Sequence, residues 1–300
     1  MKAKSMKMKN RVNSAADVVA AVITVVSVVA MILYTLSLLI LPLFMTLTSF
    51  KTGTIECIQN PFGLPKSFHY QNYIDIIHIF ETKMKVGIGQ MVLTSVVMSV
   101  LKPLITVIFT TFWAYSEAKY DFLGKKFFFS LGIIVMIVPI IGNLPSAMHI
   151  YKALNVYDNI VMNILVTPVG CFSGTAFLLL YGIFKNLPWD YAESIFMDGG
   201  GRYTAMFVIY IPMALPTMAT MFILDFMAQW NDTGTYMLWL PSYPNLAFGM
   251  YLFYQKASQF RVNLPQLMAG FTLVMIPTIL LYFATNKIIL TKFAVGGLKG

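Results

Sequence analysis

The groups best able to bind a partner are clustered in one short break between apolar stretches. Residues 193–212, ESIFMDGGGRYTAMFVIYIP, contain two carboxylates, three successive glycines and an arginine. Asp190 lies three residues before Glu193, so a helix would place both carboxylates on one face. Carboxylates in such a group accept charge-assisted hydrogen bonds from a basic surface or a helix amino terminus. The local chemistry leaves two interpretations open: a docking element for a partner, or an ordinary connecting loop.

The composition places this break in a membrane protein. The chain has 300 residues, of which 58% are hydrophobic and 11% charged, and its mean hydropathy is +0.73. A soluble domain carries about 25% charged residues, so lipid must solvate most of this chain. The net charge of +9 therefore indicates retained cytoplasmic Lys and Arg and not a nucleic-acid partner. Cys57 and Cys171 form no CxxC motif, which argues against a disulfide framework or metal site.

Six apolar stretches are long enough to cross a bilayer, which takes about 20 residues. Only helices satisfy their own backbone in lipid, so we expect an all-α integral membrane protein with six transmembrane helices. The first apolar run is too long for a signal peptide and is expected to be retained. Most Lys and Arg residues fall in segments on the side of the amino terminus, which predicts that both termini are cytoplasmic. The predicted spans are 18–45, 88–114, 128–148, 159–184, 207–229 and 266–290.

Residues 189–197 predict a short amphipathic helix at the inner membrane face, which Gly199, Gly200 and Gly201 would end. Two charges, Lys102 and Asp225, fall inside predicted spans, where a charge is costly. They either form an ion pair between neighbouring helices or extend separately toward the outer interface.

The break resembles the cytoplasmic signature of bacterial ABC-importer permeases, E-A-A-x-x-D-G-A followed by I-x-L-P and a second proline. The departures are Ser194 and Ile195 for the two alanines and Gly200 for the last one. They leave the register of the signature intact. The matching residues are Phe184, Pro188 and Asp190 in the lead-in, then Glu193, Asp198, Gly199, Arg202, Tyr203, Ile209, Pro212 and Pro216.

Further motifs are similar to the carbohydrate (maltose permease-like) subgroup of that family: PFGLPKSFHYQNY at 61–73, AYSEAKYDFLGKK at 114–126, QWND at 229–232 and VGGLKG at 295–300. The resemblance implies the type I ABC importer permease fold. It also implies the permease subunit of an ATP-driven, binding-protein-dependent importer for a sugar or oligosaccharide, in the bacterial cell (inner) membrane. The residues implied to couple to an ATPase are Asp190, Glu193, Asp198, Gly199 and Arg202.

The partners implied by the resemblance are a second homologous permease, two ATPase subunits and an extracytoplasmic solute-binding protein. We expect no enzyme activity and no cofactor on this chain, with ATP and Mg on the ATPase. The phosphate-binding motif G-x-x-x-x-G-K-[ST] does not occur, since Gly124-Lys125 has Lys119 at the position of the first glycine and Lys126 at that of the hydroxyl.

The expected segments are a basic cytoplasmic tail at 1–14, a first transmembrane helix at 15–46, an outer segment at 47–86, a five-helix core at 87–292 with the coupling loop at 185–206, and a cytoplasmic tail at 293–300. Four polar residues near or within spans are candidates for the substrate path, although asparagines that serve packing would look identical. They are Asn143, Asn163, Gln229 and Asn231.

Three alternatives compete with this interpretation. One is an ABC permease for a non-sugar solute. Another is an ion-coupled secondary carrier, for which we would expect paired broken helices and inverted repeats, and the sequence shows neither. The third is an intramembrane serine hydrolase using Ser173 in GCFSG, but the spacing departs from G-x-S-x-G. A small residue in a helix interface is the favoured role for Ser173.

Overall fold

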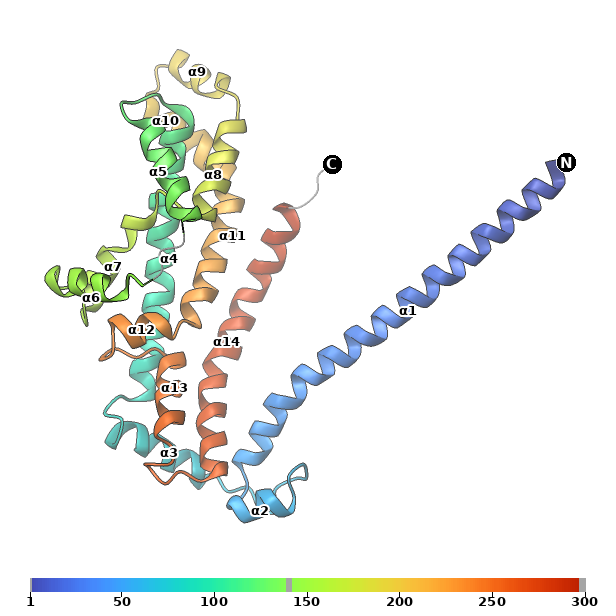
Figure 1. The fold of residues 1–300 in the computed structure, drawn as a ribbon, viewed down its shortest axis with the longest axis vertical. Coiled ribbons are helices and arrows are strands. Elements are labelled where there is room, and N and C mark those ends of the chain that lie inside the picture. Colours follow the sequence, from blue (N-terminus) through green and yellow to red (C-terminus); the bar gives the residue numbers. More distant parts are fainter. Residues whose placement is uncertain (1, 139–141, 297–300) are drawn as a thin grey trace. The chain divides into compact units, whose positions relative to one another are not determined.

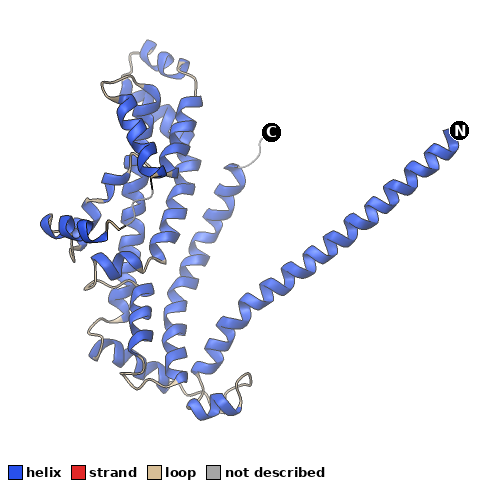
Figure 2. Cartoon of the chain, viewed as in Figure 1, coloured by secondary structure: helices blue, strands red, loops and turns tan. Residues whose placement is uncertain are grey.

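The computed structural model describes residues 2–138 and 142–296, with side chains over 18–138 and 142–283. Every regular element in these ranges is helical (Figure 2), which confirms the all-α fold. The elements, labelled in Figure 1, are α1 Lys2–Ser49, α2 Thr54–Gln59, α3 Gln71–Thr82, α4 Ile88–Lys119, α5 Lys125–Ile137, α6 Leu144–Ala153, α7 Ile160–Leu165, the 3₁₀ turn η1 Thr167–Gly170, α8 Thr175–Asn186, α9 Asp190–Met197, α10 Arg202–Ala205, the π-helical turn η2 Met206–Tyr210, α11 Ile211–Trp230, α12 Gly234–Trp239, α13 Leu246–Lys256 and α14 Leu264–Gly296.

Four helices within the described residues are long and apolar enough to span a membrane, and a fifth candidate is bent. Ile160–Gly170 and Thr175–Asn186 meet at 47°, where Gly174 takes a φ of +98° that favours glycine. The hydropathy pattern predicts one continuous span at 159–184 and does not indicate this break. The four continuous helices are Val18–Ser49, Ile88–Lys119, Arg202–Trp230 and Leu264–Phe283.

The predicted span at 128–148 is not a single helix in the described residues. α5 has 13 residues and ends at Ile137, which at 1.5 Å per residue is about 20 Å, short of the roughly 30 Å hydrocarbon core. α6 begins at Leu144, with Pro145 in its first turn. Residues 139–141 of this span, and most of the VGGLKG motif at 295–300, lie outside the described residues. Six spans are therefore not confirmed; the structure supports four or five.

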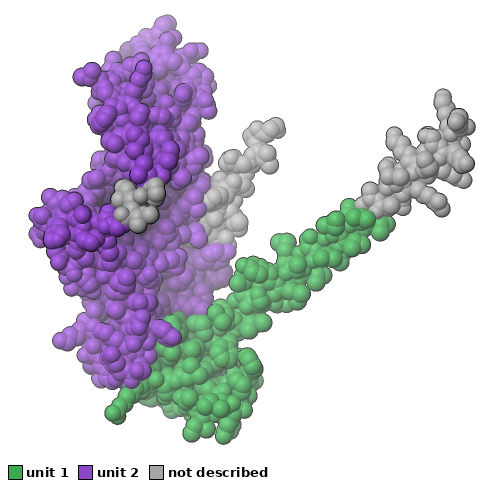
Figure 3. Space-filling model, in the orientation of Figure 1, with its two compact units in different colours: residues 1–76, 261–273 green, residues 77–260, 274–300 purple. Residues whose placement is uncertain are grey.

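The chain forms two compact units (Figure 3). Unit 1 comprises residues 1–76 and 261–273, and unit 2 comprises residues 77–260 and 274–300. α14 contributes its first turns to unit 1 and the rest of its length to unit 2.

Polar side chains organise the segment that follows α1 in unit 1. The fully buried Lys51 donates from Nζ to the carbonyl oxygens of Asn60 and Pro61. The buried Asn72 donates from Nδ2 to the carbonyl oxygens of Ser49 at 2.8 Å and Lys51 at 2.9 Å. Since buried polar side chains need hydrogen-bond partners, the bonds of Lys51 and Asn72 fix the path of the PFGLP segment.

Glu56 joins the two ends of the same segment. Its Oε2 accepts from the amide and the hydroxyl of Thr52 at 2.8 and 2.7 Å, and its Oε1 accepts from the amide of Lys66 at 2.7 Å. The hydrogen bonds from the Lys66 and Thr52 amides lower the pKa of Glu56 to about 2, because they stabilise the ionised form.

We predict that this segment depends on the Glu56 carboxylate. Because the folded pKa lies below the ordinary value, the stabilisation is present above about pH 4.5 and is lost as the pH falls toward 2. Hydrogen–deuterium exchange of the amides in 52–66 should show protection that falls over this window. Glu56→Gln should reduce protection at neutral pH and remove its dependence on acid. The control is Glu81→Gln, at an exposed position of α3; equal protection in all three proteins would contradict the prediction.

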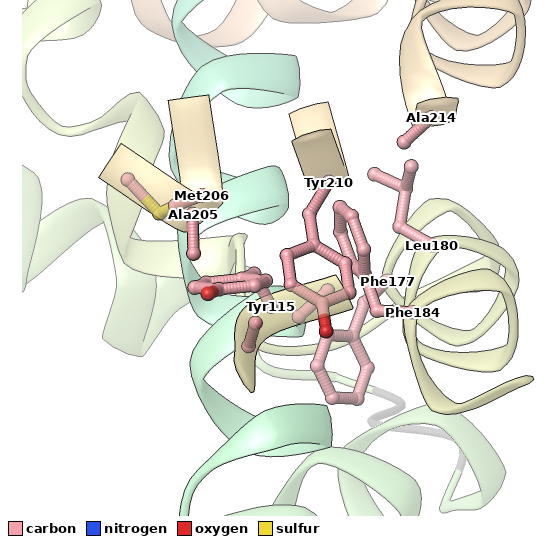
Figure 4. Close-up of a cluster of buried hydrophobic side chains, with 10 residues drawn as sticks. Tyr115, Phe177, Leu180, Phe184, Ala205, Met206, Tyr210 and Ala214 are labelled. Carbon is pink, nitrogen blue, oxygen red and sulfur yellow. The ribbon is translucent and has the colours of Figure 1, made fainter. Parts of the chain in front are cut away.

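In unit 2, α4 packs against α8 and α11. Figure 4 shows aromatic side chains meeting between them, with Tyr115 from α4, Phe177 and Phe184 from α8 and Tyr210 from η2. Each of these is at most 2% exposed. Large buried aromatic side chains dominate the energetics of such an interface. This cluster forms the base on which α9 lies.

Candidate functional site

The short helix α9 is held to the core through two backbone carbonyls in the turn that precedes it. The Leu187 carbonyl oxygen, just past α8, accepts from Lys119 Nζ at the end of α4. The next carbonyl oxygen, that of Pro188, accepts from Tyr210 Oη at 3.0 Å. On α9 itself Ala192 is fully buried. The helix predicted at 189–197 is thus confirmed and anchored to α4 and η2.

Trp189 extends this anchoring at the start of α9. Its ring lies edge-on to Tyr120, with centroids 5.8 Å apart, and to Phe196 at 6.1 Å. The guanidinium of Arg202 lies 5.4 Å from the centroid of the same Tyr120 ring, a cation–π arrangement. The residues on both sides of α9 therefore converge on the segment that follows α4.

The glycines end α9 in a Schellman motif. The Gly200 amide donates to the Ile195 carbonyl at 2.8 Å, and the Gly199 amide donates to that of Phe196 at 3.1 Å. This pattern places Gly199 at the position that takes the left-handed conformation, and its φ is +81°. A Cβ on Gly199 would meet no atom within 4 Å. Glycine is favoured there by the backbone conformation and not by crowding.

The predicted coupling residues are brought together on and beside the outward side of α9. Asp190, Glu193, Asp198 and Arg202 are all exposed. Their side chains form no ion pair, since Lys125–Asp121, at 3.0 Å, is the one ion pair within the described side chains. The apolar neighbours of this surface are exposed as well: Met197 is 87% and Tyr203 79% accessible. The surface combines unpaired carboxylates with large uncovered apolar groups.

Of the four candidate path residues, Asn163 lines a large cavity. The cavity has a volume of about 510 Å³ and is bounded by α4, α6, α7, η1 and α12. Asn163 of α7 accepts from Lys102 Nζ at 3.1 Å through its Oδ1. Tyr151 and Trp239 also line the cavity, with their ring centroids 4.3 Å apart. Sequence analysis missed both rings because the chain has too many aromatic residues to select among.

The other candidate path residues lie elsewhere. Asn143 is exposed just before α6. Asn231 donates to the Met227 carbonyl at 2.9 Å and lines a smaller hollow of about 100 Å³ beside α14. Gln229 Oε1 is buried without a hydrogen-bond partner among the described residues. The four residues therefore do not form one site.

Of the two alternatives for Lys102 and Asp225, the predicted ion pair is absent from the described side chains. Lys102 donates to Asn163 instead, and the described side chains contain no ion pair of Asp225. The hydroxyl of Ser173 is bonded to the Gly170 carbonyl at 3.3 Å, a local helix-turn contact. The structure therefore gives no support to a hydrolase.

Comparison with known proteins points to one class. No protein-family model matches the chain. The inner membrane ABC transporter permease protein YcjP of Escherichia coli is 26% identical, over 85% of this chain and 89% of YcjP. The arabinooligosaccharides transport system permease protein AraQ of Bacillus subtilis is also 26% identical, over 69% and 72%. The diacetylchitobiose uptake system permease protein NgcG of Streptomyces coelicolor is 26% identical over 67% of this chain, which spans 64% of the length of NgcG.

A solved structure agrees with these relatives on the fold. It is a bacterial ABC transporter involved in the import of the acidic polysaccharide alginate, matched with a TM-score of 0.68 and 19% identity over 89% of this chain and 96% of the other. In sequence and in fold, this chain is similar to ABC-transporter permeases. It is a multi-pass membrane protein, as its apolar helices require.

The chain departs from the permease signature that it resembles at two positions that contact each other. A Cβ on Gly200 would lie 2.5 Å from Ile195 Cγ2 and 3.0 Å from the Ile195 carbonyl oxygen. Where the family pattern has alanine at both positions, this permease has a larger side chain at 195 and none at 200. The branched side chain of Ile195 takes the space of the missing methyl group. The two substitutions compensate for each other and preserve the end of α9.

We predict that Gly200→Ala strains the end of α9 in the permease. Overpacking of this kind costs about 1–3 kcal/mol, so amide exchange in 190–200 should accelerate. Ile195→Ala combined with Gly200→Ala restores the family pattern and should recover the protection lost in Gly200→Ala. The matched control is Gly201→Ala, where a Cβ meets nothing within 4 Å. If Gly200→Ala and Gly201→Ala behave alike, the compensation does not exist.

Proposed function

We propose that this permease is the transmembrane subunit of an ATP-driven, binding-protein-dependent importer for a sugar or oligosaccharide. The observation that carries the proposal is the outward surface of α9, where Asp190, Glu193 and Asp198 lie exposed beside the uncovered Met197. Its support comes from relatives such as AraQ and NgcG, whose names describe oligosaccharide and diacetylchitobiose transport.

In this proposal the surface of α9 docks into a cleft of an ATPase subunit. Glu193, Asp190 and Asp198 accept charge-assisted hydrogen bonds from basic or helix-amino-terminal groups, and Met197 is buried on docking. Gly199 allows the turn that ends the docked helix, and Arg202 holds that turn against Tyr120. ATP and Mg are bound by two ATPase subunits, because this chain lacks a phosphate-binding motif.

The complete assembly in this proposal includes a second homologous permease and an extracytoplasmic solute-binding protein. Both termini and the loop at 185–206 are cytoplasmic, and the segment 47–86 is outside. The predicted span at 128–148 supplies the sixth crossing of a type I importer fold. The segments proposed are the tail at 1–14, the helix at 15–46, the core at 87–292 and the tail at 293–300.

We predict that removing the central carboxylate of α9 uncouples transport. Glu193→Ala should lower uptake and substrate-stimulated ATP hydrolysis at least about tenfold, the scale of a lost charge-assisted hydrogen bond, while membrane insertion stays normal. Gly199→Asp, which adds a carboxylate at the turn, should have the same effect. The control is Asp121→Asn, which removes an exposed carboxylate in the loop between α4 and α5. Normal coupling in both α9 variants would refute the docking proposal.

We predict the topology through impermeant thiol labelling of single-cysteine variants in a background without Cys57 and Cys171. A cysteine at Phe62, which is 83% exposed, should react from outside. A cysteine at Leu123, which is fully exposed, should react only after permeabilisation. Labelling in the opposite order would reverse the orientation and remove α9 from the cytoplasm.

A further inference from the structure

The cavity beside Lys102 lies at mid-length of the spanning helix α4. Lys102 lies near the middle of α4, the longest span of unit 2. α6, α7 and α12 lie around the same part of α4 in Figure 1, and each contributes residues to the cavity. Since lysine is costly at that depth, it requires a polar partner or an aqueous space.

Lys102 has unused capacity to donate hydrogen bonds. An ammonium group has three donors, and among the described residues its acceptor is Asn163 Oδ1. An acid with an electrostatic effect on it is Asp232, whose Oδ1 accepts from the Thr235 amide at 3.0 Å. Asp232 does not line the cavity, and Lys102 is the charged residue among the described residues that do. The cavity therefore presents a cation to whatever enters it.

The remaining walls suit a saccharide. Tyr151 and Trp239 meet at an interplanar angle of 48° with centroids 4.3 Å apart, and they form an aromatic surface on which a sugar ring can stack. The hydroxyls of Thr167 and Thr235 lie on lining residues as well. Binding sites typically combine apolar and aromatic walls with a few polar groups that fix orientation.

We propose that this cavity is a substrate subsite and that the imported saccharide carries an anionic group, a carboxylate such as that of a uronic acid, which Lys102 binds. Asn163 positions the ammonium, and the Tyr151–Trp239 surface holds the sugar ring that bears the anion. This inference rests on the proposed sugar import and adds a charge requirement to it. The competing occupant is a carboxylate of the second permease, and the experiment below separates the two.

The experiment uses the complete transporter in proteoliposomes, with its partner permease, ATPase subunits and solute-binding protein. The probes are uronate oligosaccharides, their neutral methyl esters and neutral oligosaccharides of the same length. They are screened first for binding to the solute-binding protein, and the bound ones are then tested for ATP-dependent uptake. The variants are Lys102→Met, Lys102→Arg as the conservative change, and Lys152→Met as control, since Lys152 contacts Tyr157 and does not line the cavity.

We expect uptake of a uronate oligosaccharide and not of its methyl ester. Lys102→Met should lower kcat/KM for that uptake at least about tenfold, as loss of a charge-assisted hydrogen bond does. Lys102→Arg should retain most of the activity, and Lys152→Met should match the wild type.

Three results would overturn the inference. In the first, only neutral saccharides are taken up, and Lys102→Met takes them up as fast as the wild type. This result would support sugar import but refute the requirement for an anionic group. Failure of Lys102→Met to assemble with the second permease in the absence of substrate shows that the lysine pairs within the complex. If no saccharide of any kind is bound or taken up, the proposed function itself fails and the subsite fails with it.

Discussion

Two hydrogen bonds to consecutive carbonyls determine what α9 can do. The carbonyl oxygens of Leu187 and Pro188 lie in the turn between α8 and α9, and they accept hydrogen bonds from Lys119 and Tyr210. The two donors come from α4 and η2, which are neighbours of α8 in the aromatic cluster. A displacement of α9 must therefore be accompanied by a displacement of the membrane-spanning helices, or these bonds must break. A surface helix that is rigidly attached in this way can transmit force.

Sequence reasoning located α9 well because its signals are local. Glycine at a helix end, carboxylates at a three-residue spacing and the surrounding apolar runs all act within a few residues. The same reasoning missed the contact between Ile195 and Gly200, since it depends on the geometry of the Schellman turn. It also missed the cavity, because Tyr151 and Trp239 come from segments far apart in the chain. Their proximity is a property of the tertiary fold.

The intramembrane charges show the same limit. The positions of Lys102 and Asp225 along their predicted spans place them at similar depths in the membrane, which is compatible with an ion pair. Depth alone does not determine which faces of the two helices are in contact. Asn163 lies in the first half of a span that bends between α7 and α8 at Gly174, and hydropathy does not detect such a bend because both halves are apolar. For the same reason the stretch at 128–148 read as one continuous span, whereas α5 ends at Ile137.

The π-helical turn η2, between α10 and α11, has a consequence for how motion could pass from α9 into the membrane. A π turn accommodates one residue more than an α-helical turn in the same rise, so α11 starts about 100° out of phase with a continuous α-helix, given 3.6 residues per turn. If the π turn moved to another position along the helix, the residues between its old and new positions would rotate about the helix axis, and the axis itself would stay straight. Tyr210, the last residue of η2 and the donor to Pro188, lies at this phase shift. A shift of the π turn would thus rotate part of the helix about its own axis at the residue that anchors α9.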